Sequence, residues 1–148
     1  MITCFVTTAS IAQKSKIQDD IQGTWKLSEI LEGGARVNLE KSELALSKSL
    51  KGKATVEQRK DLESRKAPTL KTMKTVSLVI KGNTLQYTVK KQVHKGTFTL
   101  EPYSGFYYLM TTKYTDGGTA NLYIFVKNKK LIMREGIHVD SNESVFIR

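Results

Sequence analysis

The sequence is poor in cysteine and histidine, two of the residues from which nucleophiles, proton shuttles and metal sites are commonly built. Its 148 residues include one cysteine and two histidines. Cys4 belongs to an apolar amino-terminal segment, so a chain without this segment could form no disulfide, zinc–cysteine site or thiolate nucleophile. A P-loop and a dinucleotide-binding fingerprint are also missing. These absences predict a protein that uses no cofactor.

The histidines do not sit in a recognisable catalytic pattern. His94 falls in a predicted turn, where a solvated surface position is expected. His138 and Asp140 are two residues apart and could hydrogen-bond on one face of a strand, with Ser141 and Ser144 close behind. These serines lack the glycines of a nucleophile elbow, and "DSNES" lacks the spacing and central glycine of a calcium loop. The sequence therefore predicts no catalytic residue, no metal site and no enzymatic activity.

Long hydrophobic runs are also absent, and beyond the amino terminus none approaches the about 20 residues that cross a bilayer. The opening stretch "MITCFVTTASIAQKSK" carries no charged side chain before Lys14. Within it, Ser10-Ile11-Ala12 has the small-x-small pattern that precedes signal-peptidase cleavage. Residues 1–12 are therefore predicted to be the remnant of a signal peptide, and the mature protein to be secreted or periplasmic. The basic start of a signal peptide is missing, which leaves a short apolar first strand as the alternative.

Alternation of apolar and polar residues predicts a mainly β protein. "GTWKLSEIL" places Trp25, Leu27 and Leu31 on one face of a first strand that ends at Gly33-Gly34. After residue 70, short β-rich segments follow one another, with turns expected at residues 82–83, 94–96, 116–118 and around 128. "ESVFIR" supplies a last strand. About eight strands at this spacing predict an antiparallel up-and-down barrel, whose closure removes exposed sheet edges.

The segment from residue 38 to 67 has a different composition. It is rich in Lys, Glu, Leu, Ala and Ser and has no aromatic residue, as helix propensity prefers. Leu39, Leu46 and Leu50 form one stripe, and "TVEQ" (55–58) is a capping box. We expect a helical insertion after the first strand, with short helices near residues 39–51 and 56–66, the second ended by Ala67-Pro68.

The stretch "DDIQGTWKL" resembles the start of a lipocalin-type barrel, in which a helical turn leads into Gly-x-Trp on the first strand. "KGTFTLEP" and "GGTANLYIFVKNKKLIMREG" are similar to the strand rhythm of small exported bacterial lipocalin-like proteins. The resemblance covers residues 19–148 as one domain. It implies that Gly23 and Trp25 form the structural motif at the closed end, with Arg148 or Arg134 packed across the indole. The helical insertion departs from the family pattern and resembles the lid of fatty-acid-binding proteins. It could act as a lid over the open end of the barrel or be a surface decoration, and the sequence does not choose between the two.

The barrel interior is predicted from the more apolar phase of each strand. For residues 106–113 and 119–126 both phases are apolar, and an error of one residue inverts the face. These side chains either line a ligand cavity or simply fill the barrel. The predicted ligand-binding positions are Leu27, Val76, Leu78, Tyr87, Phe98, Phe106, Tyr108, Met110, Ile124 and Met133, with Val89 and Leu122 as further inward positions.

The sequence is strongly basic, with a formal net charge of +10. Ten of the basic residues lie between residues 41 and 74. They predict attraction of an anionic amphipathic molecule towards an apolar barrel mouth. The basic residues there lack interleaved aromatic residues, so nucleic acid is not expected. The prediction is a monomeric binding protein for a small hydrophobic or amphipathic, anionic ligand; the alternative is a filled barrel whose basic surface contacts a protein or polyanion.

Overall fold

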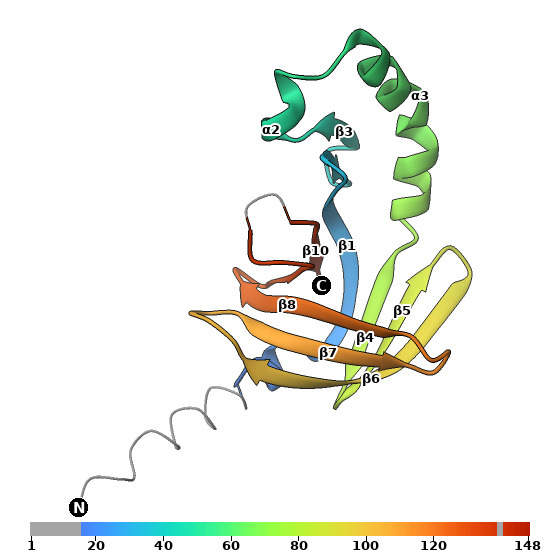
Figure 1. Ribbon diagram of the computed structural model, residues 1–148. Helices are drawn as coiled ribbons and strands as arrows, with labels where there is room; N and C mark the ends of the chain where they lie inside the picture. The colour runs from blue at the N-terminus through green and yellow to red at the C-terminus, as the bar shows by residue number, and fades with distance from the viewer. Residues whose placement is uncertain (1–15, 139–140) are drawn as a thin grey trace, which may run out of the picture.

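A computed structural model describes residues 16–138 and 141–148 and shows a mainly β protein built on an eight-stranded, closed antiparallel barrel (Figure 1). The strands pair in the order β10-β9-β8-β7-β6-β5-β4-β1, and β10 pairs with β1 to close the barrel. The predicted fold class is therefore confirmed. The barrel strands are β1 (Gly23–Glu32), β4 (Ser77–Lys81), β5 (Thr84–Val89), β6 (Gln92–Pro102), β7 (Tyr108–Tyr114), β8 (Thr119–Lys127), β9 (Lys130–Arg134) and β10 (Glu143–Ile147).

A second group of elements projects from one end of the barrel (Figure 1). It begins with the hairpin of β2 (Ala35–Asn38) and β3 (Glu43–Leu46), in which β2 pairs with the far end of β1. The short helix α2 (Lys48–Lys51) and the long helix α3 (Val56–Met73) follow. We call residues 35–73 the arm. Helix α3 packs on β3, and none of its residues is buried.

The predicted position of the helical insertion needs correction. The main helix follows β3 and not the first strand, and the helix expected over residues 39–51 is a strand followed by one turn of α2. Leu44 lies opposite Val37 in the hairpin, and both side chains are buried. Leu44 and Leu46 thus follow the two-residue period of a strand, because pairing with β2 outweighs the helical propensity of this Lys- and Glu-rich segment. The capping box at Thr55 and Gln58 is present and begins α3.

The predicted end of the second helix is also wrong. Helix α3 continues through Pro68 to Met73, although proline removes one backbone donor from the helix. Thr69 and Met73, in the last turns, face the hairpin across a narrow groove, and Met73 packs against the barrel core. Packing of this last part of the helix offsets the hydrogen bond lost at the proline.

The first strand changes phase along its length. Its register against β10 shifts between Leu27 and Glu29, so the strand contains a bulge. Trp25 and Leu27 face the core before the bulge, and Ile30 packs against the core after it. Because the bulge adds one residue, the simple alternation that placed Leu31 on the dry face fails at this point.

The turn expected at residues 94–96 is not where the sequence indicated. Strand β6 begins at Gln92, and the chain reverses at Lys90, which has a positive φ of 55°. Gly96 lies inside the strand, where an added Cβ would be 2.7 Å from the Lys113 carbonyl oxygen of β7. The glycine therefore serves a close approach of two strands and not a turn.

Several sequence predictions lie outside the described residues. These are the signal-peptide remnant at residues 1–12 with Cys4, and Asp140, the predicted partner of His138. Within the described residues, no helix has the length and apolar character that crossing a membrane requires.

Candidate functional site

One end of the barrel is closed by the tryptophan. Trp25 is fully buried, and its indole nitrogen donates a hydrogen bond of 2.8 Å to the Ile21 carbonyl in the turn that precedes β1. The Arg148 guanidinium lies 4.6 Å from the centre of the indole ring and donates hydrogen bonds to the carbonyls of Asp20 and Gln22. Gly23, between them, has a φ of 122°, which a side chain would disfavour. Gly-x-Trp thus joins the turn before β1 to Arg148, which follows β10, and we call this contact the plug.

Arg134 was the other sequence candidate for the contact with Trp25, and the structure places it elsewhere. Its guanidinium donates to the Tyr107 hydroxyl at 2.9 Å and to the His138 carbonyl at 2.6 Å, and its Nε lies 3.2 Å from a Glu143 carboxylate oxygen. Glu143 begins β10, at the other end of that strand from Ile147 and Arg148. Of the two arginines, Arg148 is therefore the one over the indole.

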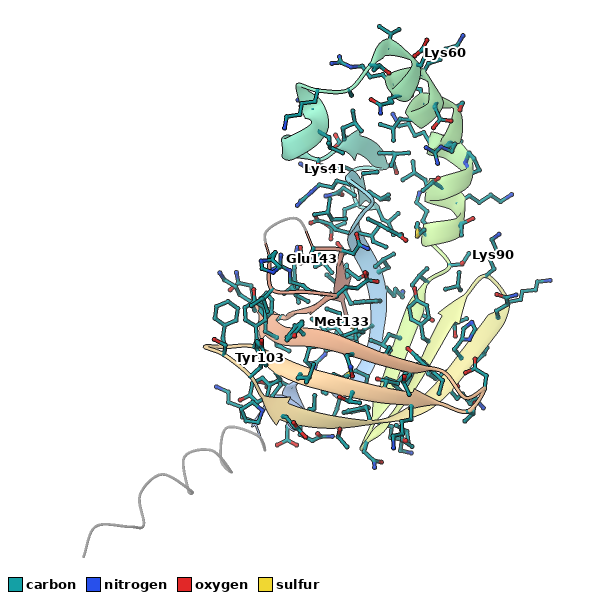
Figure 2. The ribbon with its side chains drawn as sticks, in the orientation of Figure 1. Lys41, Lys60, Lys90, Tyr103, Met133 and Glu143 are labelled. Carbon is teal, nitrogen blue, oxygen red and sulfur yellow. The ribbon has the colours of Figure 1, made fainter. Side chains whose placement is uncertain are left out.

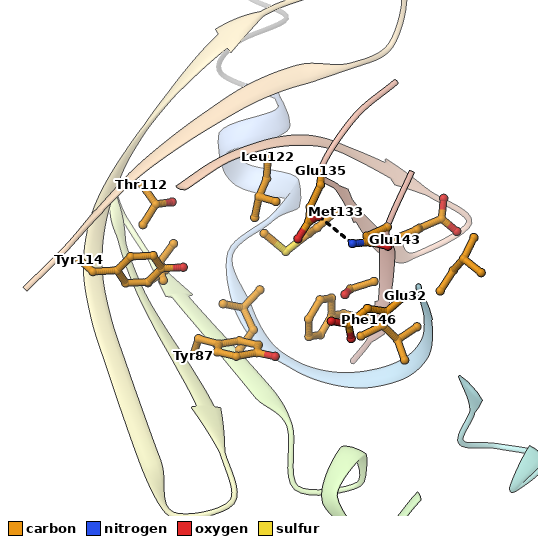
Figure 3. A pocket seen from close by; sticks show the side chains of 15 residues that line it. Glu32, Tyr87, Thr112, Tyr114, Leu122, Met133, Glu135, Glu143 and Phe146 are labelled. Atoms are coloured by element: carbon orange, nitrogen blue, oxygen red, sulfur yellow. Dashed lines mark hydrogen bonds between the residues drawn. The ribbon is translucent and has the colours of Figure 1, made fainter. Parts of the chain in front are cut away.

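A cavity of about 250 Å³ lies at the end of the barrel nearest the arm (Figure 3). Its wall combines aliphatic and aromatic side chains with hydroxyls, and carboxylates stand at its mouth. The lining residues are Ile30, Leu31, Glu32, Leu78, Leu85, Tyr87, Thr112, Tyr114, Leu122, Met133, Glu135, Asn142, Glu143, Ser144 and Phe146.

The predicted ligand-binding residues divide between this cavity and the packed core. Leu78, Tyr87 and Met133 line the cavity, as does the further inward position Leu122. Six others belong to the buried core and do not line the cavity: Leu27, Val76, Phe98, Tyr108, Met110 and Ile124. The cavity thus occupies only part of the barrel interior, and packed side chains fill the rest.

Phe106 is a correction, because it does not point into the barrel. It lies in the loop between β6 and β7 with 62% of its surface exposed, and it contacts Tyr107 and Phe125 on the outside of the barrel. In β7 and β8, the two strands whose inward face the sequence left open, the even-numbered residues point inward, since Tyr108, Met110 and Ile124 are buried. The alternation that places Tyr108 inward therefore does not extend back to Phe106, which precedes the strand.

The sequence prediction missed the polar lining. Glu32 follows the bulge in β1, and Glu135 and Asn142 flank a loop that the pattern of strands did not define. Asn142 joins this lining by donating to a Glu135 carboxylate oxygen at 2.8 Å and by accepting from the Gly33 amide at 3.2 Å. Thr112 and Tyr114 had a usable signal, because both continue the even phase of Tyr108 and Met110 along β7.

The electrostatic character of the cavity is set by carboxylates and buried phenols. The pKa of Tyr87 is raised, first by burial and then by the negative charges of Tyr114 and Glu32 when these ionise. Burial also raises the pKa of Tyr114, with Asp116 as a smaller cause. Both phenols are therefore neutral hydrogen-bonding groups at neutral pH, in an environment that disfavours further negative charge.

The Thr112 hydroxyl stands out among the polar groups of the cavity wall. Thr112 is 1% exposed, and its Oγ1 has no hydrogen-bond partner among the described residues. Figure 3 shows this hydroxyl directed towards the cavity. A buried hydroxyl without a partner costs roughly 1–3 kcal/mol of folding free energy, which a ligand atom in the cavity could recover.

The histidines lie away from the cavity lining. His94 Nδ1 is 3.6 Å from an Asp116 carboxylate oxygen, and both side chains are exposed. His138 precedes the undescribed residues 139–140, and its carbonyl accepts from Arg134. Over the described residues, no group of three or more His, Cys, Asp and Glu side chains is placed to hold a metal ion.

Fold and site together define an antiparallel β-barrel with one closed end and one hollow end. Comparisons with protein-family models, curated proteins and solved structures give no match for this chain.

Proposed function

We propose that this protein is a lipocalin-like binding protein that holds a small hydrophobic or amphipathic molecule in the hollow end of its barrel. The observation that carries the proposal is the cavity of about 250 Å³, walled by Leu78, Leu85 and Met133 and open beside the arm. About half of the lining residues are apolar and the others carry hydroxyl, amide or carboxylate groups, and a concave site of this mixed kind suits a small amphipathic molecule. The plug of Trp25 and Arg148 supports the comparison with lipocalins, because it seals one end and leaves one entrance.

We propose a carrier role without catalysis, which the same lining supports. The cavity contains hydroxyls and carboxylates, and neither histidine lines it. Because binding and release need no chemical step, we propose that the protein is not an enzyme; that it is a monomer stays a prediction. Export to the periplasm or the exterior stays a prediction from residues 1–12.

The cavity can be tested directly by identifying what it holds. The full chain, purified from cells under native conditions, is weighed by native mass spectrometry and then extracted with solvent. We expect a stoichiometric small molecule that is released on extraction. A chain that carries nothing, and whose mass stays unshifted in a panel of anionic, neutral and cationic amphiphiles, would contradict the proposal.

A variant with a filled cavity sharpens this test. Leu122→Trp introduces a large side chain into the cavity, so it should abolish binding while the barrel stays folded. Leu109→Trp is the matched control, because Leu109 lies on the same sheet with the opposite, outward phase. We expect loss of the ligand in the first variant only, with unchanged circular dichroism in both.

The arm offers a second, non-enzymatic function. Helix α3 buries none of its residues and carries the basic residues Arg59, Lys60, Lys66 and Lys71; Lys60 lies at the end of the helix far from the barrel (Figure 2). A projecting basic helix suits contact with an acidic protein or polyanion. Binding of heparin that is lost when these four residues are changed to glutamine would support this function.

A further inference from the structure

We infer that the molecule bound in the cavity is a small organic amine: a protonated ammonium group on a compact apolar body. This inference rests on the proposed binding function and deepens it. It also replaces the anionic ligand that net charge suggested, because the groups that line the cavity differ in sign from the protein as a whole.

The charge of the cavity lining is negative. Glu32, Glu135 and Glu143 border the mouth, and among the described residues that line the cavity none is a lysine or arginine. Glu143 is paired with Arg134, whose Nε is 3.2 Å away, and Glu135 accepts from the uncharged Asn142 amide, so Glu32 and Glu135 keep their negative charge for a ligand. Arg65 of α3 borders a neighbouring groove beside Glu32, but its guanidinium is paired with Asp61. An anionic head at this mouth would meet like charge, whereas an ammonium group would meet two carboxylates.

Aromatic rings extend the same preference into the cavity. Tyr87, Tyr114 and Phe146 lie on different sides of the opening (Figure 3). The face of an aromatic ring is electron-rich and attracts an ammonium group, most strongly where water is excluded. Burial keeps both phenols neutral, as their raised pKa values indicate, so the rings contribute without a charge of their own.

The inner part of the cavity selects the body of the ligand. Leu78, Leu85 and Leu122 supply an apolar wall, and the cavity of about 250 Å³ is smaller than typical sites for drug-sized molecules, which are roughly 300–1,000 Å³. The unpartnered Thr112 hydroxyl lies in this wall and can donate to or accept from a polar group of the ligand. A single ring with an aminoalkyl chain and a distal hydroxyl meets all three requirements.

Three probes of nearly equal shape separate the charge preference from binding itself. Tyramine carries the ammonium head, tyrosol replaces it with a hydroxyl, and 3-(4-hydroxyphenyl)propionate replaces it with a carboxylate. Each is titrated into the isotope-labelled full chain, and the shifts of amide resonances from the cavity residues are followed by NMR. We expect tyramine to bind more tightly than tyrosol by about five- to tenfold and the carboxylate to bind least.

Variants test which groups produce this order. The double variant Glu32→Gln/Glu135→Gln should lower the affinity for tyramine by roughly five- to tenfold, because each exposed carboxylate is expected to contribute about two- to fivefold. The affinity for tyrosol should not change. Glu40→Gln/Glu101→Gln removes the same charge from positions outside the cavity lining and should change neither affinity.

Thr112→Val keeps the shape of the side chain and removes its hydroxyl. It should abolish the preference for tyramine over phenethylamine, which lacks the ring hydroxyl, without lowering stability. This readout depends on the deep end of the cavity and is independent of the carboxylates at the mouth.

The outcomes distinguish the two proposals. Tighter binding of the carboxylate probe, or equal binding of all three probes in the wild-type chain, would overturn the amine inference and leave the binding function standing. Failure of every probe to bind, together with an empty protein after native purification, would overturn both.

Discussion

The barrel and the arm are built in opposite ways. The barrel encloses a continuous core that runs from Ile17 and Trp25 at the closed end to Phe146 beside the cavity. The arm has a small contact between Val37 and Leu44, and its main helix buries no side chain. Burial of apolar area therefore holds the barrel, while strand pairing, a helix cap and charge hold the arm. This difference makes the barrel the rigid part and the arm the adaptable part.

The charge of the two regions differs as strongly as their packing. The arm carries much of the positive charge of the chain, whereas the cavity mouth beside it presents Glu32 and Glu135. Net charge acts on a diffusing molecule at a distance, but the groups in contact with a bound ligand decide which ligand stays. A composition of +10 therefore describes the surface of this protein and not its cavity.

The largest loss of stability is expected from a substitution in the best-packed part of the barrel. Trp25→Ala should lower the free energy of unfolding by about 3–5 kcal/mol, because it removes a fully buried side chain together with its hydrogen bond to Ile21. Val56→Ala, in the arm, should change stability by less than about 0.5 kcal/mol, since Val56 is 83% exposed. Urea denaturation measures both. Equal costs would contradict the contrast between the two regions.

Two arginines provide a finer comparison. Arg148→Gln should cost about 1–2 kcal/mol of stability, because it removes the contact with the Trp25 ring and the hydrogen bonds to two carbonyls. Arg36→Gln removes an exposed ion pair with Glu29, at 3.1 Å, and should cost less than about 1 kcal/mol. Thermal unfolding of both variants gives the comparison, and a larger loss for Arg36→Gln would refute the role assigned to the plug.

Loss of a helix cap should act on the arm alone. Thr55→Ala removes the hydroxyl that accepts from the Gln58 amide at 3.2 Å, at a local cost of about 1 kcal/mol. Amide hydrogen exchange should accelerate in α3 and stay unchanged in β6 and β7. Thr55→Ser serves as the control, because it keeps a capping hydroxyl. Acceleration throughout the barrel strands would show that the two regions unfold together.

The smallest change in stability is expected from the ionisation of tyrosine at alkaline pH. It should arise in the barrel, because the arm contains no tyrosine. The pKa of Tyr87 is raised above its ordinary value of 10.0 by burial and by nearby negative charge, so the folded state holds this proton more tightly than the unfolded state. Its contribution to stability is complete below pH 10 and is lost as pH rises through the folded pKa. Tyr87→Phe should flatten this decline, as measured by denaturation between about pH 9 and 11. An identical decline in the variant would argue against the shift.

Much of the barrel could be predicted from the sequence because its signals are local. Alternating apolar residues and the turns at residues 82–83, 116–118 and 128 define most of the strands, and Thr55 and Gln58 begin α3 as the capping box predicts. The errors occur where distant segments meet. Leu44 joins a strand because of Val37, and Gly96 sits inside a strand because the Lys113 carbonyl approaches it. Neither partner is visible in a local pattern.

The sequence by itself determined the class of fold. Some eight segments alternate apolar and polar residues, and strands with one apolar face have few ways to bury that face other than a closed or stacked sheet. Tertiary structure alone decided the site. The bulge after Leu27 turned Ile30 towards the interior, and closure of the barrel brought Glu32 and Glu135, and likewise Tyr87 and Tyr114, into the lining of one cavity. A cavity is made of residues far apart in the chain, and its volume and charge depend on which side chains closure brings together.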